Sequence, residues 1–193
     1  MLFRSKFALL SVVSFLLISC GSTSETTSSN TDSQAEQSSA QAPADPANAG
    51  YYIDGIVYTL VNGELEQAIE DSTTVNKFKL LDFKAAGDIN KDGTDDVAVV
   101  LTNDAGGSGT FYYLAIFTSG SSPVIENTSY LGDRIVVNDI TFTNNQFQVK
   151  YLDRDSEADM ASDPTIEITG IAEMDAENTG FIFSCTDTAG ICL

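Results

Sequence analysis

The sequence predicts a mostly β fold: a single antiparallel β-sandwich, or a strongly curved sheet, behind a disordered tether. Three observations lead to this fold class. From residue 51 to the end of the chain, short segments rich in apolar, β-branched and aromatic residues recur. Gly, Asn and Asp residues separate these segments, as expected for tight turns. No segment has the apolar periodicity of a long amphipathic helix, so we expect neighbouring strands to pair in antiparallel order.

The first 20 residues have the composition of a secretory signal. Arg4 and Lys6 precede an apolar segment, residues 7–18, that is too short for a membrane-spanning helix. The signal ends in Leu-Ile-Ser-Cys at Cys20 and resembles the lipobox of bacterial lipoproteins. This resemblance implies that Cys20 is acylated and becomes the first residue of the mature protein. The alternative is an ordinary cleaved signal with an incidental cysteine.

The lipobox resemblance implies a lipid anchor and a place in the cell envelope. Acyl chains on Cys20 would hold the protein at a membrane surface without spanning the bilayer. Because Gly21 and not an aspartate follows the cysteine, the resemblance implies the outer membrane in a cell with two membranes. In a cell with one membrane, the protein would lie on its outer face.

Residues 21–50 form the predicted tether. They contain no aromatic or large aliphatic side chain and consist mainly of Ser, Thr, Gln, Ala, Asn and Asp. A segment with so little apolar surface cannot offset its ordering entropy, so we expect it to be disordered. The β-rich domain is therefore predicted to span residues 51–193.

Turn signals divide that domain into strands. A hairpin is expected around Asp54-Gly55 and Asn62-Gly63, followed by a short helical turn or a connector at residues 65–69. Residues 96–102 are nearly all apolar, which indicates a central strand buried on both faces and paired through the Gly-rich loop 103–109 with the next strand. The other strands are predicted at residues 75–85, 110–118, 124–131, 135–137, 140–143, 146–152, 165–172 and 180–185. Asn144-Asn145 is expected to turn a hairpin between residues 140–143 and 146–152.

One loop of the domain has the spacing of a metal site. In GDINKDGTDD, residues 87–96, oxygen-bearing side chains recur at alternate positions and Gly93 permits a sharp turn. Ca²⁺ takes about six to eight oxygen ligands, which a loop of this kind can bring together. The predicted ligands of this weak, mainly structural Ca²⁺ site are Asp88, Asn90, Asp92, Thr94 through its carbonyl, and Asp96. The alternative is a metal-free turn whose Asp and Asn side chains bond local backbone amides.

The segment GDINKDGTDDVAVV resembles the calcium loops of FG-GAP repeats, in which a similar loop leads into a β-strand. The resemblance implies the loop chemistry alone, because a propeller needs several copies and this chain has one. An EF-hand is excluded, since Val99 stands where that loop needs its closing glutamate. The longer pattern that continues through TFYYLAIF to YLGDRI resembles a group of uncharacterised exported bacterial lipoproteins, which implies no activity.

Composition narrows the possible functions. The chain has no histidine, which excludes Ser-His-Asp and Cys-His catalysis and the usual His-containing zinc sites. Its 28 acidic and 9 basic residues give a net charge of −19, which excludes nucleic acid as a partner and suits cations or basic proteins. Carboxylate pairs could in principle cleave glycosidic bonds, but no pair is distinguished from the others. We therefore predict that the protein is not an enzyme.

Cys185 and Cys192 lie close together near the end of the chain. In an oxidising exported compartment, they are expected to form a disulfide that closes the C-terminal tail. Free thiols, or a link to another chain, are the alternatives.

These observations lead to two hypotheses of function. In the first, the protein is a membrane-anchored envelope lipoprotein with a Ca²⁺-binding loop and acts as a binding or structural module. In the second, it is a metal-independent acidic inhibitor or accessory protein that binds a basic protein of the envelope.

Overall fold

The computed structural model of this chain describes residues 45–69, 72–119, 126–155 and 157–187. The signal, Cys20, most of the predicted tether and Cys192 lie outside these ranges. No helix within them has the length and apolar character needed to cross a membrane.

The described chain is built of antiparallel strands and one short 3₁₀ helix, η1 (Pro46–Asn48). The strands are β1 (Gly50–Ile53), β2 (Ile56–Thr59), β3 (Glu64–Ala68), β4 (Val75–Gly87), β5 (Asp96–Asp104), β6 (Phe111–Phe117), β7 (Thr128–Asp133), β8 (Val136–Thr143), β9 (Gln146–Asp153), β10 (Ile166–Met174) and β11 (Phe181–Asp187).

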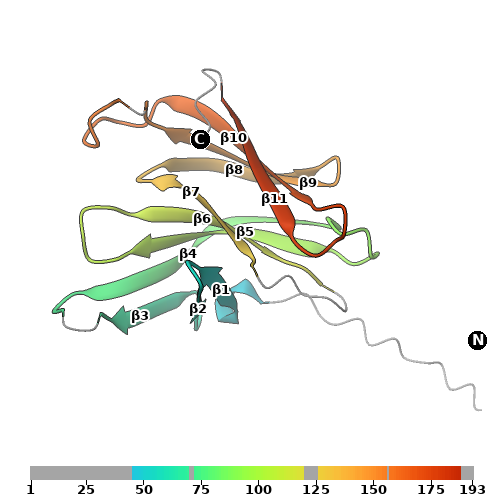
Figure 1. Cartoon of the computed structure of the whole chain (residues 1–193), viewed down its shortest axis with the longest axis horizontal. Helices are drawn as coiled ribbons and strands as arrows, with labels where there is room; N and C mark the ends of the chain where they lie inside the picture. Colours follow the sequence, from blue (N-terminus) through green and yellow to red (C-terminus); the bar gives the residue numbers. More distant parts are fainter. Residues whose placement is uncertain (1–44, 70–71, 120–125, 156, 188–193) are drawn as a thin grey trace, which may run out of the picture. The chain divides into compact units, whose positions relative to one another are not determined.

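The strands form three antiparallel sheets (Figure 1). A five-stranded sheet has the order β3-β4-β5-β6-β7, a four-stranded sheet has the order β11-β10-β9-β8, and β1 pairs with β2 in a separate hairpin. The prediction of a mostly β, antiparallel sandwich fold is thereby confirmed.

Two apolar cores hold these sheets together. The larger core lies between the two main sheets, where Val100 and Ile116 of the five-stranded sheet meet Phe147 and Val149 of the four-stranded sheet. The smaller core lies on the opposite face of the five-stranded sheet and includes Tyr51 of the β1–β2 hairpin. Alternate residues of β5 enter the two cores. The prediction of a central strand that is buried on both faces is therefore confirmed.

The predicted hairpin turns also form. Asp54 and Gly55 both have positive φ, 51° and 84°, between β1 and β2. Asn144 and Asn145, with φ of 53° and 60°, do the same between β8 and β9. Two consecutive residues of positive φ match the right-handed twist of the strands they join, and Asn, Asp and Gly adopt this conformation most readily.

Residues 65–69 were predicted as a helical turn or a connector, and this prediction is wrong. Residues 64–68 form the edge strand β3, which pairs with β4. Leu65 packs on the smaller core, whereas Glu64 and Glu66 are exposed. An edge strand with one inward apolar side chain is too short to show a clear alternation.

The boundary of the tether is also corrected. Residues 45–50, assigned to the tether from composition, belong to the fold. Asp45 caps η1 by accepting a hydrogen bond from the amide of Ala47, and Pro46 is buried. The Tyr51 hydroxyl donates to the carbonyl of Pro46 at 2.8 Å. A proline that packs under a buried tyrosine gives no hydrophobic pattern in the sequence.

The two main sheets pack closely along one side, where β4 contacts β8. The backbone of Gly87 lies directly under the ring of Phe142, so that a Cβ built on Gly87 would be 2.0 Å from the nearest ring carbon. This glycine immediately precedes the acidic loop and therefore fixes the loop's place in the fold.

Candidate functional site

The acidic loop, residues 88–95, connects β4 to β5. Its ends are held together because Gly87 pairs with Asp96 at the last position of the β4–β5 ladder. Lys91 and Gly93 have positive φ, 61° and 89°, and turn the chain within the loop. The glycine predicted to permit the turn does so.

Three of the predicted ligands converge inside this loop. The carboxylate of Asp88 accepts hydrogen bonds from the amides of Asp92 at 3.0 Å and Gly93 at 2.9 Å. The side-chain oxygen of Asn90 accepts from the Asp92 amide at 3.0 Å. Asp92 in turn accepts from the Thr94 amide at 2.8 Å and from the Asn90 side-chain amide at 3.1 Å. The three side chains thus surround one short stretch of backbone.

These hydrogen bonds do not use all of the acceptor capacity of the loop's oxygens. Each carboxylate oxygen can accept more than one interaction, and those of Asp88 accept one described bond apiece. Asp92 is exposed, and Asp88 and Asn90 are half-buried. No described hydrogen bond occupies the carbonyl of Thr94. The loop is accordingly complete as a turn and still presents oxygens to solvent.

Asp96 differs from the other predicted ligands, because it is fully buried. One oxygen accepts from the amides of Ile89 at 2.9 Å and Asn90 at 3.4 Å, and the other accepts from the amide of Ser119 at 2.7 Å. Burial raises the pKa of Asp96, while these three amide bonds oppose the shift. Asp96 therefore ties the acidic loop to the end of β6 and is placed as an anchor of the loop.

The acidic loop also contacts the four-stranded sheet. The side-chain amide of Asn178, in the β10–β11 turn, donates to the carbonyl of Asn90 at 3.4 Å. The two connections lie side by side in Figure 1. Within the turn, Asp175 accepts from the amide and the hydroxyl of Thr179, both at 2.8 Å. A conformational change in the acidic loop can therefore affect both main sheets.

The described residues contain no group of three or more His, Cys, Asp or Glu side chains placed to hold a metal ion. The arrangement of the acidic loop differs from such a group, because two of its predicted ligands are an amide oxygen and a backbone carbonyl. Metal binding here would depend on Asp88, Asn90, Asp92 and Thr94 acting together.

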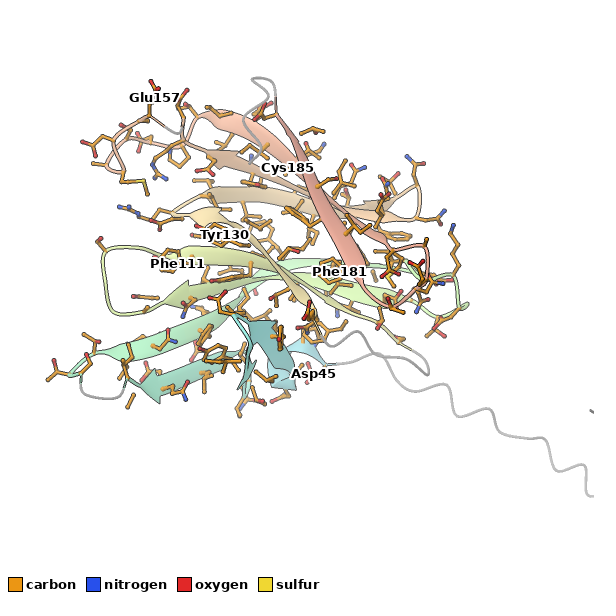
Figure 2. The ribbon with its side chains drawn as sticks, viewed as in Figure 1. Asp45, Phe111, Tyr130, Glu157, Phe181 and Cys185 are labelled. Atoms are coloured by element: carbon orange, nitrogen blue, oxygen red, sulfur yellow. The ribbon has the colours of Figure 1, made fainter. Side chains whose placement is uncertain are left out.

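The structure bears on only one of the three cysteines. Cys185 lies on β11 (Figure 2) and is disulfide-bonded. Cys192, its predicted partner, lies outside the described residues, as does Cys20. The Cys185–Cys192 pairing and the acylation of Cys20 stay predictions.

A cavity of about 640 Å³ opens at the other end of β10 and was not indicated by the sequence analysis. We call it the edge cavity, because β7 and β11, each an edge strand of one main sheet, contribute to its walls. Its principal residues are Tyr130, Leu131, Tyr151, Asp153, Ile168 and Phe183. The sequence contains one indication of this cavity. The inward-facing positions of β9 are Phe147, Val149, Tyr151 and Asp153, so a series of mainly apolar side chains ends with a carboxylate.

Comparison with protein-family models, with curated proteins and with solved structures found no match to this chain.

Proposed function

We propose that this protein is a lipid-anchored component of the cell envelope that binds Ca²⁺ at its acidic loop and serves as a binding or structural module, not as an enzyme. Cys20 would carry the anchor at the outer membrane, or at the outer face of a single membrane. The residues between Cys20 and Asp45 would separate the β fold from the lipid surface.

One observation carries the Ca²⁺ part of the proposal: the side-chain oxygens of Asp88, Asn90 and Asp92 together accept hydrogen bonds from three consecutive backbone amides, those of residues 92–94, at 2.8–3.0 Å. Hard cations favour such clusters of oxygen atoms. The carboxylates also repel one another at short range, and a divalent cation would relieve that repulsion.

The proposed ligands are the side chains of Asp88, Asn90 and Asp92 and the carbonyl of Thr94, with water completing the coordination. Asp96 is left out as a direct ligand, because its side chain is fully buried and three backbone amides hold its oxygens. A site with two carboxylates and no closing glutamate should be weak, in about the millimolar range of extracellular modules.

Bound Ca²⁺ would act on structure. It would stiffen the connection between β4 and β5, and through Asn178 the effect would extend to the β10–β11 turn. Ca²⁺ binding of this kind stabilises the folded chain, because the unfolded chain has no preformed site.

A second candidate is the metal-independent acidic inhibitor or accessory protein that binds a basic envelope protein. It is supported by the completeness of the turn without a cation, since every predicted side-chain ligand already accepts a backbone amide. In this case the surplus of 19 negative charges would recognise the partner directly.

Thermal unfolding of the full-length chain separates the two candidates. The melting temperature is measured in EDTA, in about 10 mM Ca²⁺, and in Mg²⁺ at the same concentration to account for screening of the net charge. The test variant is Asp88→Asn/Asp92→Asn, which keeps oxygen acceptors for the backbone amides and removes two charges. The control variant is Asp82→Asn/Asp139→Asn, two exposed acids outside the loop.

We expect Ca²⁺ to raise the melting temperature of the native chain and of the control variant by about 3–5 °C more than Mg²⁺ does. The loop variant should respond equally to both ions. If Ca²⁺ and Mg²⁺ act alike on all three proteins, the Ca²⁺ site is refuted and the second candidate becomes the better account.

A further inference from the structure

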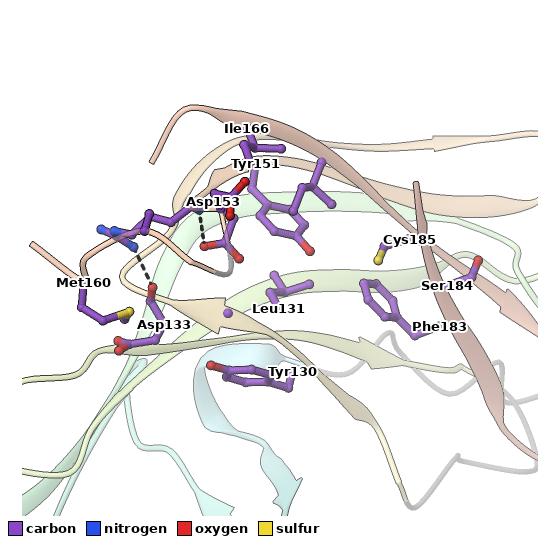
Figure 3. Close-up of a pocket in the computed structure, with 15 residues that line it drawn as sticks. Tyr130, Leu131, Asp133, Tyr151, Asp153, Met160, Ile166, Phe183, Ser184 and Cys185 are labelled. Carbon is purple, nitrogen blue, oxygen red and sulfur yellow. Dashed lines mark hydrogen bonds between the residues drawn. The ribbon is translucent and has the colours of Figure 1, made fainter. Parts of the chain in front are cut away.

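The edge cavity lies where the two main sheets diverge. They pack tightly between β4 and β8, where Gly87 contacts Phe142. On the other side, β7 of one sheet faces β9, β10 and β11 of the other across a cavity of about 640 Å³ (Figure 3). This volume lies within the usual range of pockets for small molecules.

The inner walls of the edge cavity are apolar. Leu131, Ile168 and Phe183 line it from three different strands. The ring of Phe183 reaches across the backbone of Gly170, where a Cβ would be 2.5 Å from the ring. The ring is therefore fixed in position by a residue that has no side chain. An apolar body of a ligand could pack on these surfaces.

Tyr151 supplies a polar group that lacks a partner. Its side chain is 3% exposed, and none of the described hydrogen bonds involves its hydroxyl. Figure 3 shows this hydroxyl directed into the cavity, between Leu131 and Phe183. No buried side-chain nitrogen or oxygen of the described residues lacks a hydrogen-bond partner, so this hydroxyl is accessible from the cavity and can bond a ligand there. Burial raises its pKa to about 12, so the hydroxyl keeps its proton and its oxygen can accept from an N–H group.

Asp153 places a carboxylate beside this hydroxyl. Tyr151 and Asp153 are two residues apart on β9, so both side chains face the interior of the sandwich. One oxygen of Asp153 accepts from the amide of Arg154 at 2.7 Å. The other lies over Gly132, 3.0 Å from where a Cβ would stand. No described hydrogen bond or ion pair uses this second oxygen.

The nearby arginines are engaged elsewhere. Arg154 donates through its guanidinium to the backbone carbonyls of Asp133, Arg134 and Ser162. Arg134 pairs with Asp133 at 3.1 Å. Among the lining residues, three carboxylates accompany one guanidinium. The cavity therefore has an excess of negative charge that its own cations do not neutralise.

We propose that the edge cavity binds a small organic cation, a protonated amine with an apolar or aromatic body, whose ammonium group donates to Asp153 and to the Tyr151 hydroxyl. The body would pack on Leu131, Ile168 and Phe183. The ring of Tyr130 packs against Phe111 and Tyr113 on the other face of the five-stranded sheet and takes no part in this contact. This site is independent of the acidic loop, from which it is separated by the length of β10.

The titration of Asp153 agrees with this ligand class. Burial raises the pKa of its carboxyl, and the neighbouring Asp133 adds to the shift, while the backbone amide and charge of Arg154 oppose it. A carboxylate that lacks full compensation for its burial gains from a bound cation.

The experiment is calorimetric titration of the full-length chain with three probes that share a phenyl ring and a short chain. They are 2-phenylethylamine, 2-phenylethanol and 3-phenylpropanoate, which are cationic, neutral and anionic. The test variants are Asp153→Asn, which keeps an oxygen for the Arg154 amide, and Tyr151→Phe, which removes the hydroxyl alone. Asp139→Asn, an exposed change of the same charge on β8, is the control for attraction by the net charge.

We expect saturable binding of the amine by the native chain and by Asp139→Asn, and binding about tenfold weaker in Asp153→Asn. Tyr151→Phe should weaken the amine severalfold, and the alcohol should bind less tightly than the amine. The proposal is overturned if the amine does not saturate the native chain, if Asp153→Asn and Asp139→Asn bind it alike, or if the alcohol or the carboxylate binds at least as tightly.

Discussion

The acidic loop and the edge cavity lie at opposite ends of β10 and are built in opposite ways. The acidic loop takes its oxygens from the seven residues 88–94, and its side chains bond backbone amides within that stretch. The cavity takes its walls from strands as distant in the sequence as β7 and β11, and it leaves the Tyr151 hydroxyl without a described partner. Within a short loop, the polar side chains can bond the backbone amides of the loop itself. In a site assembled from distant strands, polar groups can remain without a protein partner and so be available to a ligand.

The largest expected effect concerns the packing that closes the sandwich at the loop end. Gly87→Ala would place a methyl group 2.0–2.4 Å from ring carbons of Phe142, and neither sheet can retreat without disturbing the core. We expect a loss of about 3 kcal/mol in the free energy of unfolding, measured by urea denaturation.

The control for this prediction is Gly107→Ala, at a glycine whose added Cβ would meet nothing within 4 Å. If the two substitutions cost the same, the close approach of β4 and β8 does not define the tight side of the sandwich. The proposed difference between the closely packed side of the sandwich and the side with the edge cavity would then be contradicted.

The next effect distinguishes the anchor of the acidic loop from its exposed acids. Asp96→Ala leaves the amides of Ile89, Asn90 and Ser119 without their acceptor in a buried position. We expect a loss of about 2–3 kcal/mol, compared with less than about 1 kcal/mol for Asp95→Ala, whose side chain is exposed. Urea denaturation of both variants measures the difference. Equal losses would contradict the anchoring role.

The smallest expected effect is a pH dependence of the free energy of unfolding, caused by Asp153 in the edge cavity. Because the folded state raises the pKa of Asp153 above its usual 3.8, the folded chain binds that proton more tightly than the unfolded chain does. The ionised carboxylate therefore weakens the fold at neutral pH, and this penalty disappears as the pH falls through the raised pKa toward 3.8. Asp153→Asn has no such group to titrate.

We expect Asp153→Asn to be more stable than the native chain at pH 7, with a difference that shrinks in acid. The measurement is the difference in free energy of unfolding between the two proteins from pH 7 to about pH 4. A difference that grows in acid would mean that the folded state favours the ionised carboxylate, contrary to the account of the cavity.

The features that sequence predicted are those encoded by adjacent residues. Asp54-Gly55 and Asn144-Asn145 specify their hairpins through their own backbone preferences. The continuous apolar run after the acidic loop indicates a strand buried on both faces, as β5 is. The convergence of Asp88, Asn90 and Asp92 follows from their spacing alone.

The features that sequence missed depend on pairing between distant strands. Residues 135–137 and 140–143 were predicted as separate strands, but 136–143 form one strand, β8, with an irregularity between Val137 and Asp139 that disturbs the alternation. The position of Asp96 in the loop does not reveal its burial, which comes with its contact to Ser119, a residue that follows β6. The edge cavity exists because of how the two main sheets are placed relative to each other, and a pattern of neighbouring residues does not predict that placement.

The most direct test of the account is a comparison of backbone amide NMR shifts in the full-length chain during titration with Ca²⁺ and with 2-phenylethylamine. We predict that Ca²⁺ shifts the amides of Asp92, Gly93 and Thr94 in a saturable way and leaves those of Tyr151 and Asp153 in place. The amine should do the reverse. If Ca²⁺ produces small shifts that spread over all exposed acids without saturation, the acidic loop is a turn and not a calcium site, and the central claim is contradicted.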